Sequence, residues 1–237
     1  AVLSACAKPE QPAANPEQPI NQASPRTEES PGQSGTPLTM IQPSPGVKAN
    51  LPPPRADEVQ GAVTRIFKNV VAIDTGRSPN FVVGDFNADG SQDLAVIVKP
   101  TDSDTSYLEL NNELANWLIR EPKKIVVAKA IGEARANEAR TRPDPIRKGE
   151  ELVAVIHGFG LNGWRNPEAR QTFVLKGVAG DNLRSESVKE LASRKADLPL
   201  LNGQVINNGD VISETIDGDR GMLFWTGSAY SWHAVRR

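Results

Sequence analysis

Proline is distributed so unevenly along this chain that it separates two parts with different folding prospects. Twelve of the 19 prolines lie within residues 1–54, and only seven lie in the rest of the chain. The stretch 9–54 is also rich in Gln, Ser, Asn, Gly and Thr and contains no aromatic residue. Such a composition buries too little apolar surface to offset the entropy lost on ordering. We therefore expect residues 6–54 to form a disordered tether with polyproline II character, and residues 55–237 to form a single globular domain.

Charge and composition exclude several classes of protein. The formal net charge is -2, which argues against a nucleic-acid partner bound through a basic face. No run of 18 apolar residues occurs, so the sequence predicts no membrane-spanning helix. One cysteine excludes an internal disulfide and a multi-cysteine zinc site, and two histidines exclude a multi-histidine metal centre.

The single cysteine lies in a short motif near the beginning of the chain. The quadruplet Leu3-Ser4-Ala5-Cys6 resembles the lipobox of bacterial lipoproteins. The resemblance implies that residues 1–5 end a signal peptide and that Cys6 carries a diacylglycerol that anchors the protein in a membrane. It also implies a lipid-anchored, extracytoplasmic place in the bacterial cell envelope. Ala7, where an inner-membrane lipoprotein usually has Asp, favours the outer membrane or periplasm. The alternative is an ordinary disordered N-terminus with a chance cysteine.

Hydrophobic patterning predicts the elements of the globular part. Helical spacing predicts helices over residues 56–68, 107–119 and 187–193. Short apolar and β-branched runs predict strands over residues 70–73, 81–84, 94–98, 125–128, 152–156, 172–175, 210–213, 222–226 and 229–233. Gly227-Ser228 predicts a hairpin turn between the last two strands. We therefore expect an α+β fold with a mostly antiparallel or mixed sheet and two or three helices.

Residues 85–93 place oxygen-bearing side chains at alternate positions of a loop. Loop positions 1, 3, 5 and 9 are Asp85, Asn87, Asp89 and Asp93. Gly90 at position 6 allows a sharp bend, and Ser91 offers its backbone carbonyl at position 7. Calcium takes six to eight oxygen ligands, and alternate side chains of a tight loop can converge on one ion. The pattern therefore predicts a calcium site.

This loop differs from an EF-hand, because position 12 is Val96 where an EF-hand has glutamate. Residues 79–98 resemble instead one FG-GAP or VCBS repeat, in which a similar loop joins two strands and holds calcium. Those families usually carry several copies, whereas this sequence has one, so the resemblance implies the ion site without a propeller. The alternative is a polar hairpin turn, since Asp-Gly is itself a strong turn signal.

A second segment has two interpretations. The apolar run at 152–156 leads into His157-Gly158, which resembles the oxyanion strand of α/β-hydrolases, although that family's Gly-x-Ser-x-Gly motif is missing. In a functional interpretation, His157, Trp164, Arg165 and Arg170 belong to a site for a glycan or an anionic ligand. In a structural interpretation, Trp164 is packed and the arginines pair with carboxylates.

Three functions remain open on these grounds. The first is a non-catalytic envelope lipoprotein, a calcium-stabilised binding or interaction module for an envelope protein or a glycan. The second is a secreted hydrolase or glycan-acting enzyme that uses the segment around His157. The third is a structural lipoprotein without a metal. We favour the first, because it needs only the Cys6 motif and the loop at 85–93, both of which are present.

Overall fold

A computed structural model describes residues 51–101, 105–114, 116–125, 143–201, 204–206 and 208–235. The predictions for Cys6 and for the tether up to residue 50 lie outside these residues, and the strand predicted at 125–128 lies almost entirely outside them. Within the described part of the chain, no helix is long and apolar enough to cross a membrane.

The larger sheet has six strands. They are β1 (Val71–Ile73), β2 (Phe81–Gly84), β3 (Asp93–Pro100), β4 (Leu118–Arg120), β5 (Leu152–Ile156) and β6 (Thr172–Lys176). The order is β1-β3-β5-β6-β4. Strand β2 pairs with the first half of β3, on the same edge as β1, which pairs with the second half. All pairs are antiparallel except β4 with β6. Strand β5 is buried along its whole length, because both faces of this sheet are covered.

The smaller sheet has four antiparallel strands in the order β12-β11-β10-β7. They are β7 (Asp181–Ser187), β10 (Asp210–Ile216), β11 (Asp219–Trp225) and β12 (Tyr230–Ala234). Asp217 and Gly218 both have positive φ, 54° and 85°, in the two-residue turn between β10 and β11. The hairpin predicted around Gly227-Ser228 is confirmed, with Trp225 opposite Tyr230. A separate pair is formed by β8 (Leu200–Leu201) and β9 (Gln204–Val205).

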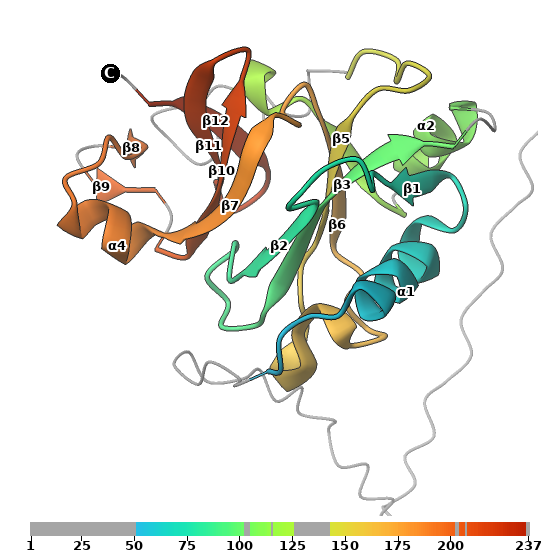
Figure 1. The fold of residues 1–237 in the computed structure, drawn as a ribbon, viewed down its shortest axis with the longest axis horizontal. Helices are drawn as coiled ribbons and strands as arrows, with labels where there is room; N and C mark the ends of the chain where they lie inside the picture. The colour runs from blue at the N-terminus through green and yellow to red at the C-terminus, as the bar shows by residue number, and fades with distance from the viewer. Residues whose placement is uncertain are drawn as a thin grey trace, which may run out of the picture. The chain divides into compact units, whose positions relative to one another are not determined.

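Alternating side chains of the strands create three apolar cores between successive layers. One face of the larger sheet packs against α1 (Ala56–Phe67), through residues such as Leu94, Val96 and Val59. The other face packs against the smaller sheet, as Figure 1 also shows. The far face of the smaller sheet packs against α4 (Val188–Ser193). The chain is therefore layered as helix, sheet, sheet and helix.

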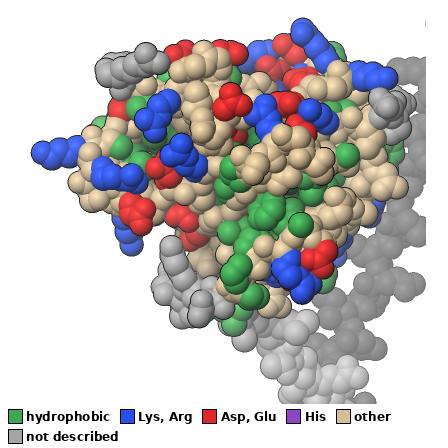
Figure 2. Space-filling view, in the orientation of Figure 1, with side chains coloured by type: hydrophobic (Ala, Val, Ile, Leu, Met, Phe, Trp, Pro, Cys, Tyr) green, Lys and Arg blue, Asp and Glu red, His purple; other side chains and the backbone are tan. Residues whose placement is uncertain are grey.

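Sheet predominates over helix in this arrangement, and the expectation of mostly antiparallel or mixed sheets is confirmed. The described helices besides α1 and α4 are α2 (Ser106–Glu113) and the 3₁₀ segments η1 (Pro122–Lys124) and η2 (Gly160–Arg165). On the face drawn in Figure 2, basic and acidic side chains are interspersed, and hydrophobic ones gather over β2.

The helix predicted over residues 107–119 is wrong in its second half. Helix α2 ends at Glu113, and residues 118–120 form strand β4 beside β6. Asn112 Oδ1 accepts a hydrogen bond from the Ile119 amide (2.7 Å), and the Trp117 indole donates to the Leu108 carbonyl (3.1 Å). Leu114, which the helical pattern placed on a buried face, is 63% exposed. Pairing with the buried strand β6 therefore overrides the helical spacing.

Candidate cation-binding site

The loop at 85–93 connects β2 to β3 at one end of the larger sheet, as the sequence predicted. Gly84 pairs with Asp93, so the loop leaves and re-enters the sheet at adjacent positions. Ala88 and Gly90 have φ of 61° and 88°, which bend the chain back on itself. The loop is therefore a tight reversal that directs its side chains toward its own backbone amides.

Asp93 lies in the interior at the base of this loop, with none of its surface exposed. Its Oδ2 accepts hydrogen bonds from the amides of Phe86 (2.7 Å) and Asn87 (3.3 Å). Its Oδ1 accepts one from the amide of Gly158 (2.7 Å), which directly follows β5 and His157. Asp93 therefore closes the loop and also fastens it to the neighbouring strand. Its assignment as a metal ligand stays a prediction.

The other side chains of the loop gather at its more exposed end. The Asp89 amide lies 3.1 Å from both Asp85 Oδ1 and Asn87 Oδ1, so these two oxygens face the same N–H group. Asp85 Oδ2 accepts from the Gly90 amide (3.2 Å), and Asp89 Oδ1 accepts from the Ser91 amide (2.7 Å). Three of the predicted ligands therefore lie on the same side of the loop.

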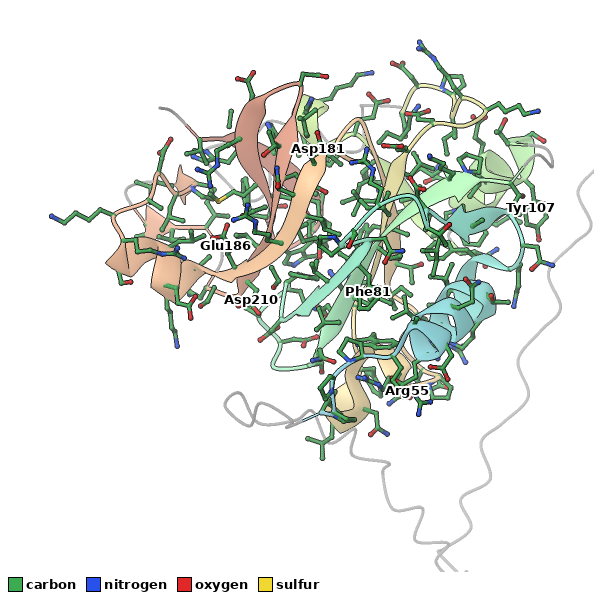
Figure 3. The ribbon with its side chains drawn as sticks, viewed as in Figure 1. Arg55, Phe81, Tyr107, Asp181, Glu186 and Asp210 are labelled. Carbon is green, nitrogen blue, oxygen red and sulfur yellow. The ribbon has the colours of Figure 1, made fainter. Side chains whose placement is uncertain are left out.

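The structure adds a fourth carboxylate that the sequence pattern did not indicate. Asp210, the first residue of β10, accepts a hydrogen bond from the Asp85 amide at 2.9 Å, and its own amide donates to the Asp85 carbonyl at 2.7 Å. Figure 3 shows Asp210 on the smaller sheet, near the loop that follows β2. Only the packing of the two sheets brings residues 125 positions apart into contact. No local signal could have identified this partner.

A hollow of about 200 Å³ lies between the loop and β10. Its lining includes the carboxylates of Asp85 and Asp210, together with Ser91 and Gln92, and contains no lysine or arginine. The Lys and Arg ion pairs among the described residues use other carboxylates, such as Asp74 and Glu151. The negative charge around this hollow is therefore not balanced by a described basic side chain.

Burial and this excess of negative charge together change the titration of the loop. Burial raises the pKa of Asp85 above its usual value, and the charges of Asp89 and Asp210 raise it further. Burial raises the pKa of Asp93 more strongly, and the charges of Asp89 and Asp85 add to the effect. A bound cation would offset the part of these shifts that comes from the neighbouring charges, so the loop favours a cation over an anion.

The residues fit a hard cation in donor type and charge, but the present arrangement is not a complete coordination shell. Among the described residues, no group of three or more His, Cys, Asp or Glu side chains is already placed to hold a metal ion. The oxygens of Asp85, Asn87 and Asp89 accept hydrogen bonds from backbone amides instead. A carboxylate oxygen has two lone pairs, so an amide contact leaves capacity for a further partner.

His157 belongs to the core between the sheets and is 1% exposed. Its ring lies 2.9 Å from Gln171 Oε1 through Nδ1 and 2.7 Å from the Tyr230 hydroxyl through Nε2. Burial lowers the pKa of His157, so the neutral ring donates to Gln171 and accepts from Tyr230. Rings of Phe173 and Trp225 also pack around it. Both ring nitrogens are therefore used inside the protein.

Trp164 and Arg165 have structural partners, as the second interpretation of this segment expected. Trp164 is fully buried, and its indole donates to Gln92 Oε1 at 3.0 Å. Arg165 stacks on Trp164 at 4.3 Å from the ring centroid and pairs with Glu58 at 3.1 Å. The two side chains therefore attach the 3₁₀ segment to α1 and offer no open aromatic face for a glycan. Arg170 lies apart from them, exposed and paired with Glu168.

Comparisons with known proteins give no information on the loop at 85–93 or on the segment around His157. No family model, no curated protein and no solved structure matches the sequence or the fold. The lipobox and FG-GAP/VCBS resemblances therefore rest on the residues of the two motifs.

Proposed function

We propose that this chain is an α+β envelope lipoprotein, anchored through Cys6, whose calcium-bound loop stabilises a non-catalytic binding or interaction module. Asp85, Asn87 and Asp89 would hold the ion, with the Ser91 carbonyl and Asp93 contributing as the motif predicts. The observation that carries the proposal is the contact of Asp85 with Asp210 beside a hollow that no basic residue lines, where the charges of Asp89 and Asp210 both raise the pKa of Asp85.

The place of the loop explains what the ion would do. The loop joins β2 to β3, contacts the end of β5 through Asp93 and contacts β10 through Asp85. A cation that removes repulsion among these carboxylates stabilises the junction of the two sheets. The ion would therefore act on the stability and rigidity of the whole module, and the chemistry it supplies is charge neutralisation.

Calcium is expected to raise the melting temperature of the protein. At about 10 mM calcium, ten to a hundred times a Kd of roughly 10⁻⁴ to 10⁻³ M, binding linkage predicts about 1.4 to 2.7 kcal/mol of stabilisation. For a domain of this size that corresponds to about 3 to 10 °C. The measurement is a thermal melt of the whole chain with calcium, and again with excess chelator. Asp89→Asn, which removes one charge at an exposed position, is expected to abolish most of the rise.

Two controls make this melt specific. Asp219→Asn removes an exposed carboxylate at the start of β11, outside the loop, and is expected to keep the full calcium effect. Magnesium at the same concentration is expected to have a smaller effect, because it needs a stricter octahedral shell. A rise of equal size in Asp89→Asn, or with magnesium, would contradict the calcium assignment.

The lipid anchor predicts a second result that is independent of calcium. When the complete precursor is produced in a bacterium, the protein is expected to fractionate with membranes and to incorporate labelled fatty acid. Cys6→Ser is expected to lose both properties, because serine lacks the thiol that carries the diacylglycerol. Equal labelling of the wild type and of Cys6→Ser would rule out the anchor.

The described contacts favour neither alternative function. For a hydrolase, His157 would have to reach a substrate, yet it is buried and both of its ring nitrogens have internal partners. For a metal-free structural lipoprotein, the loop would be only a turn whose carboxylates accept its own backbone amides. The charges of Asp89 and Asp210 beside Asp85 would then stay without a described basic side chain to balance them. The calcium melt separates this last alternative from the proposed function.

A further inference from the structure

A basic cleft lies at the C-terminal end of α1 and has a volume of about 440 Å³. Its lining includes Arg65 and Lys68 from α1 and its C-cap, Tyr107 from α2, Trp117, Pro167 and Arg170. Figure 3 shows Tyr107 beyond this end of α1, beside β1. None of these residues belongs to the loop at 85–93, so the cleft is a separate feature of the fold.

Arg65 is held in place by backbone carbonyls. Its Nη2 donates to the Trp164 carbonyl at 3.0 Å, and its Nη1 donates to the Arg165 carbonyl at 3.3 Å. Its Nε is buried and has no hydrogen-bond acceptor among the described residues. Carbonyls orient a guanidinium without neutralising it, so Arg65 keeps its positive charge and has unused N–H groups.

Lys68 adds a second charge beside Arg65. It is the C-cap of α1 with φ of 57°, and its ammonium donates to the Arg65 carbonyl at 3.0 Å. The helix dipole favours a cation at this end, which keeps the ammonium near the cleft. An ammonium has three donors, so two stay available for a ligand. Arg170 supplies a third charge at the rim, in an exposed ion pair with Glu168 that costs little to exchange.

The rest of the lining is apolar and aromatic. The Tyr107 side chain is 45% exposed, and Trp117 is almost fully buried against Phe67, with ring centroids 5.4 Å apart. Pro167 and Ile66 complete the apolar part. A volume of this size is in the usual range of small-molecule sites, which combine apolar walls with a few fixed polar groups.

We infer that the basic cleft binds a carboxylate carried on a ring, the chemistry shared by sugar acids and aromatic acids. The anion faces Arg65 and Lys68, whose charges no described carboxylate neutralises, and the ring lies against Tyr107. The carbonyl contacts fix the Arg65 guanidinium in advance, and each Nη has a second N–H beyond the one that its carbonyl accepts. This inference does not depend on calcium or on the lipid anchor.

The test is a titration of the full chain with three probes, in which ligand-observed NMR detects binding. The probes are glucuronate, which is a sugar acid, benzoate, which is an aromatic acid, and glucose, which has a ring without a charge. We expect at least one of the two acids to bind and glucose to bind much more weakly. Lys68→Gln is expected to weaken that binding about tenfold, the usual effect of losing one charge-assisted hydrogen bond.

Arg184→Gln is the matched control, because Arg184 is an exposed arginine on β7 that does not line the cleft. Lys68→Gln keeps a side chain of similar length at the same positive φ, so the backbone requirement is unchanged. Binding of glucuronate alone identifies sugar acids, and binding of benzoate alone identifies aromatic acids. Failure of both acids to bind, or equal weakening by Lys68→Gln and Arg184→Gln, overturns the inference.

Discussion

Asp93→Ala is expected to cause the largest loss of stability of any substitution in the loop. Asp93 is completely buried, and its carboxylate accepts hydrogen bonds from the amides of Phe86, Asn87 and Gly158. Alanine leaves these amides without an acceptor, and each unsatisfied buried group costs about 1 to 3 kcal/mol. We therefore expect the free energy of unfolding to fall by about 3 to 5 kcal/mol in total. The measurement is urea denaturation in the presence of chelator.

Chelator matters in that experiment, because it separates the hydrogen bonds of Asp93 from any effect on a bound ion. Asp93→Asn is the matched variant. Its amide oxygen can still accept on one side, while its NH₂ group opposes a backbone N–H on the other, so an intermediate loss is expected. Asp89→Asn, at an exposed position, should lose less than 1 kcal/mol, roughly the size of a surface change. If Asp93→Ala were no less stable than Asp89→Asn, the role given to Asp93 would be wrong.

Glu214→Gln is expected to stabilise the protein at alkaline pH. Glu214 lies on β10, is 2% exposed, and neither carboxylate oxygen has a hydrogen-bond donor in suitable geometry among the described residues. Burial raises the pKa of Glu214 to about 8, although the nearby Gly180 amide and Arg77 act to lower it. The native state therefore holds a proton that the unfolded chain releases above its ordinary pKa of 4.5.

The direction of the pH dependence follows from this difference. Stability from the protonated Glu214 is fully present below pH 4.5 and is lost progressively as the pH rises to about 8. Glutamine is neutral at every pH, so the variant escapes this loss. Relative to the wild type, we expect the free energy of unfolding of Glu214→Gln to rise by about 4 kcal/mol near pH 8 and to change little near pH 4.5, in urea denaturation at both values.

Two other groups must be considered in that comparison. Asp181 acts to raise the pKa of Glu214, and Arg77, which pairs with Asp181 at 3.0 Å, acts to lower it. His157 contributes the opposite trend, because its lowered pKa means that stability is lost as the pH falls through about 6.5. Its contribution is common to both proteins and cancels in the difference. A gain of equal size at both pH values, or the same gain in the exposed control Glu190→Gln, would refute the assignment.

The sequence was most informative where structure depends on neighbouring residues. The spacing of apolar residues at 56–68 predicted α1, and the run at 152–156 predicted β5. The loop at 85–93 was predicted as a turn between two strands, because alternating oxygen side chains and Gly90 specify a tight bend locally. The same reasoning predicted the hairpin that places Trp225 opposite Tyr230.

Sequence reasoning failed where a distant partner decided the outcome. Residues 118–120 join β6 as a strand, although their spacing matched a helix. Strand β7 was not predicted, because Leu183 is its only fully buried residue and its pattern is mostly polar. It becomes a strand by pairing with β10. In both cases the hydrogen bonds offered by an adjacent strand outweigh the local preference.

Residue type and spacing alone supply the motifs on which the proposals rest: a lipobox-like Cys6, a proline-rich stretch at 9–54 without aromatic residues, and a loop with oxygen-bearing side chains at alternate positions. The tertiary structure alone decided how those residues are used. It buried Asp93 against Gly158, brought Asp210 to Asp85, and left Arg65 and Lys68 in a cleft with an exposed tyrosine. The difference comes from the distance along the chain over which each effect acts. Residue type and spacing act over a few positions, whereas burial and the balance of charge depend on how the two sheets and α1 pack.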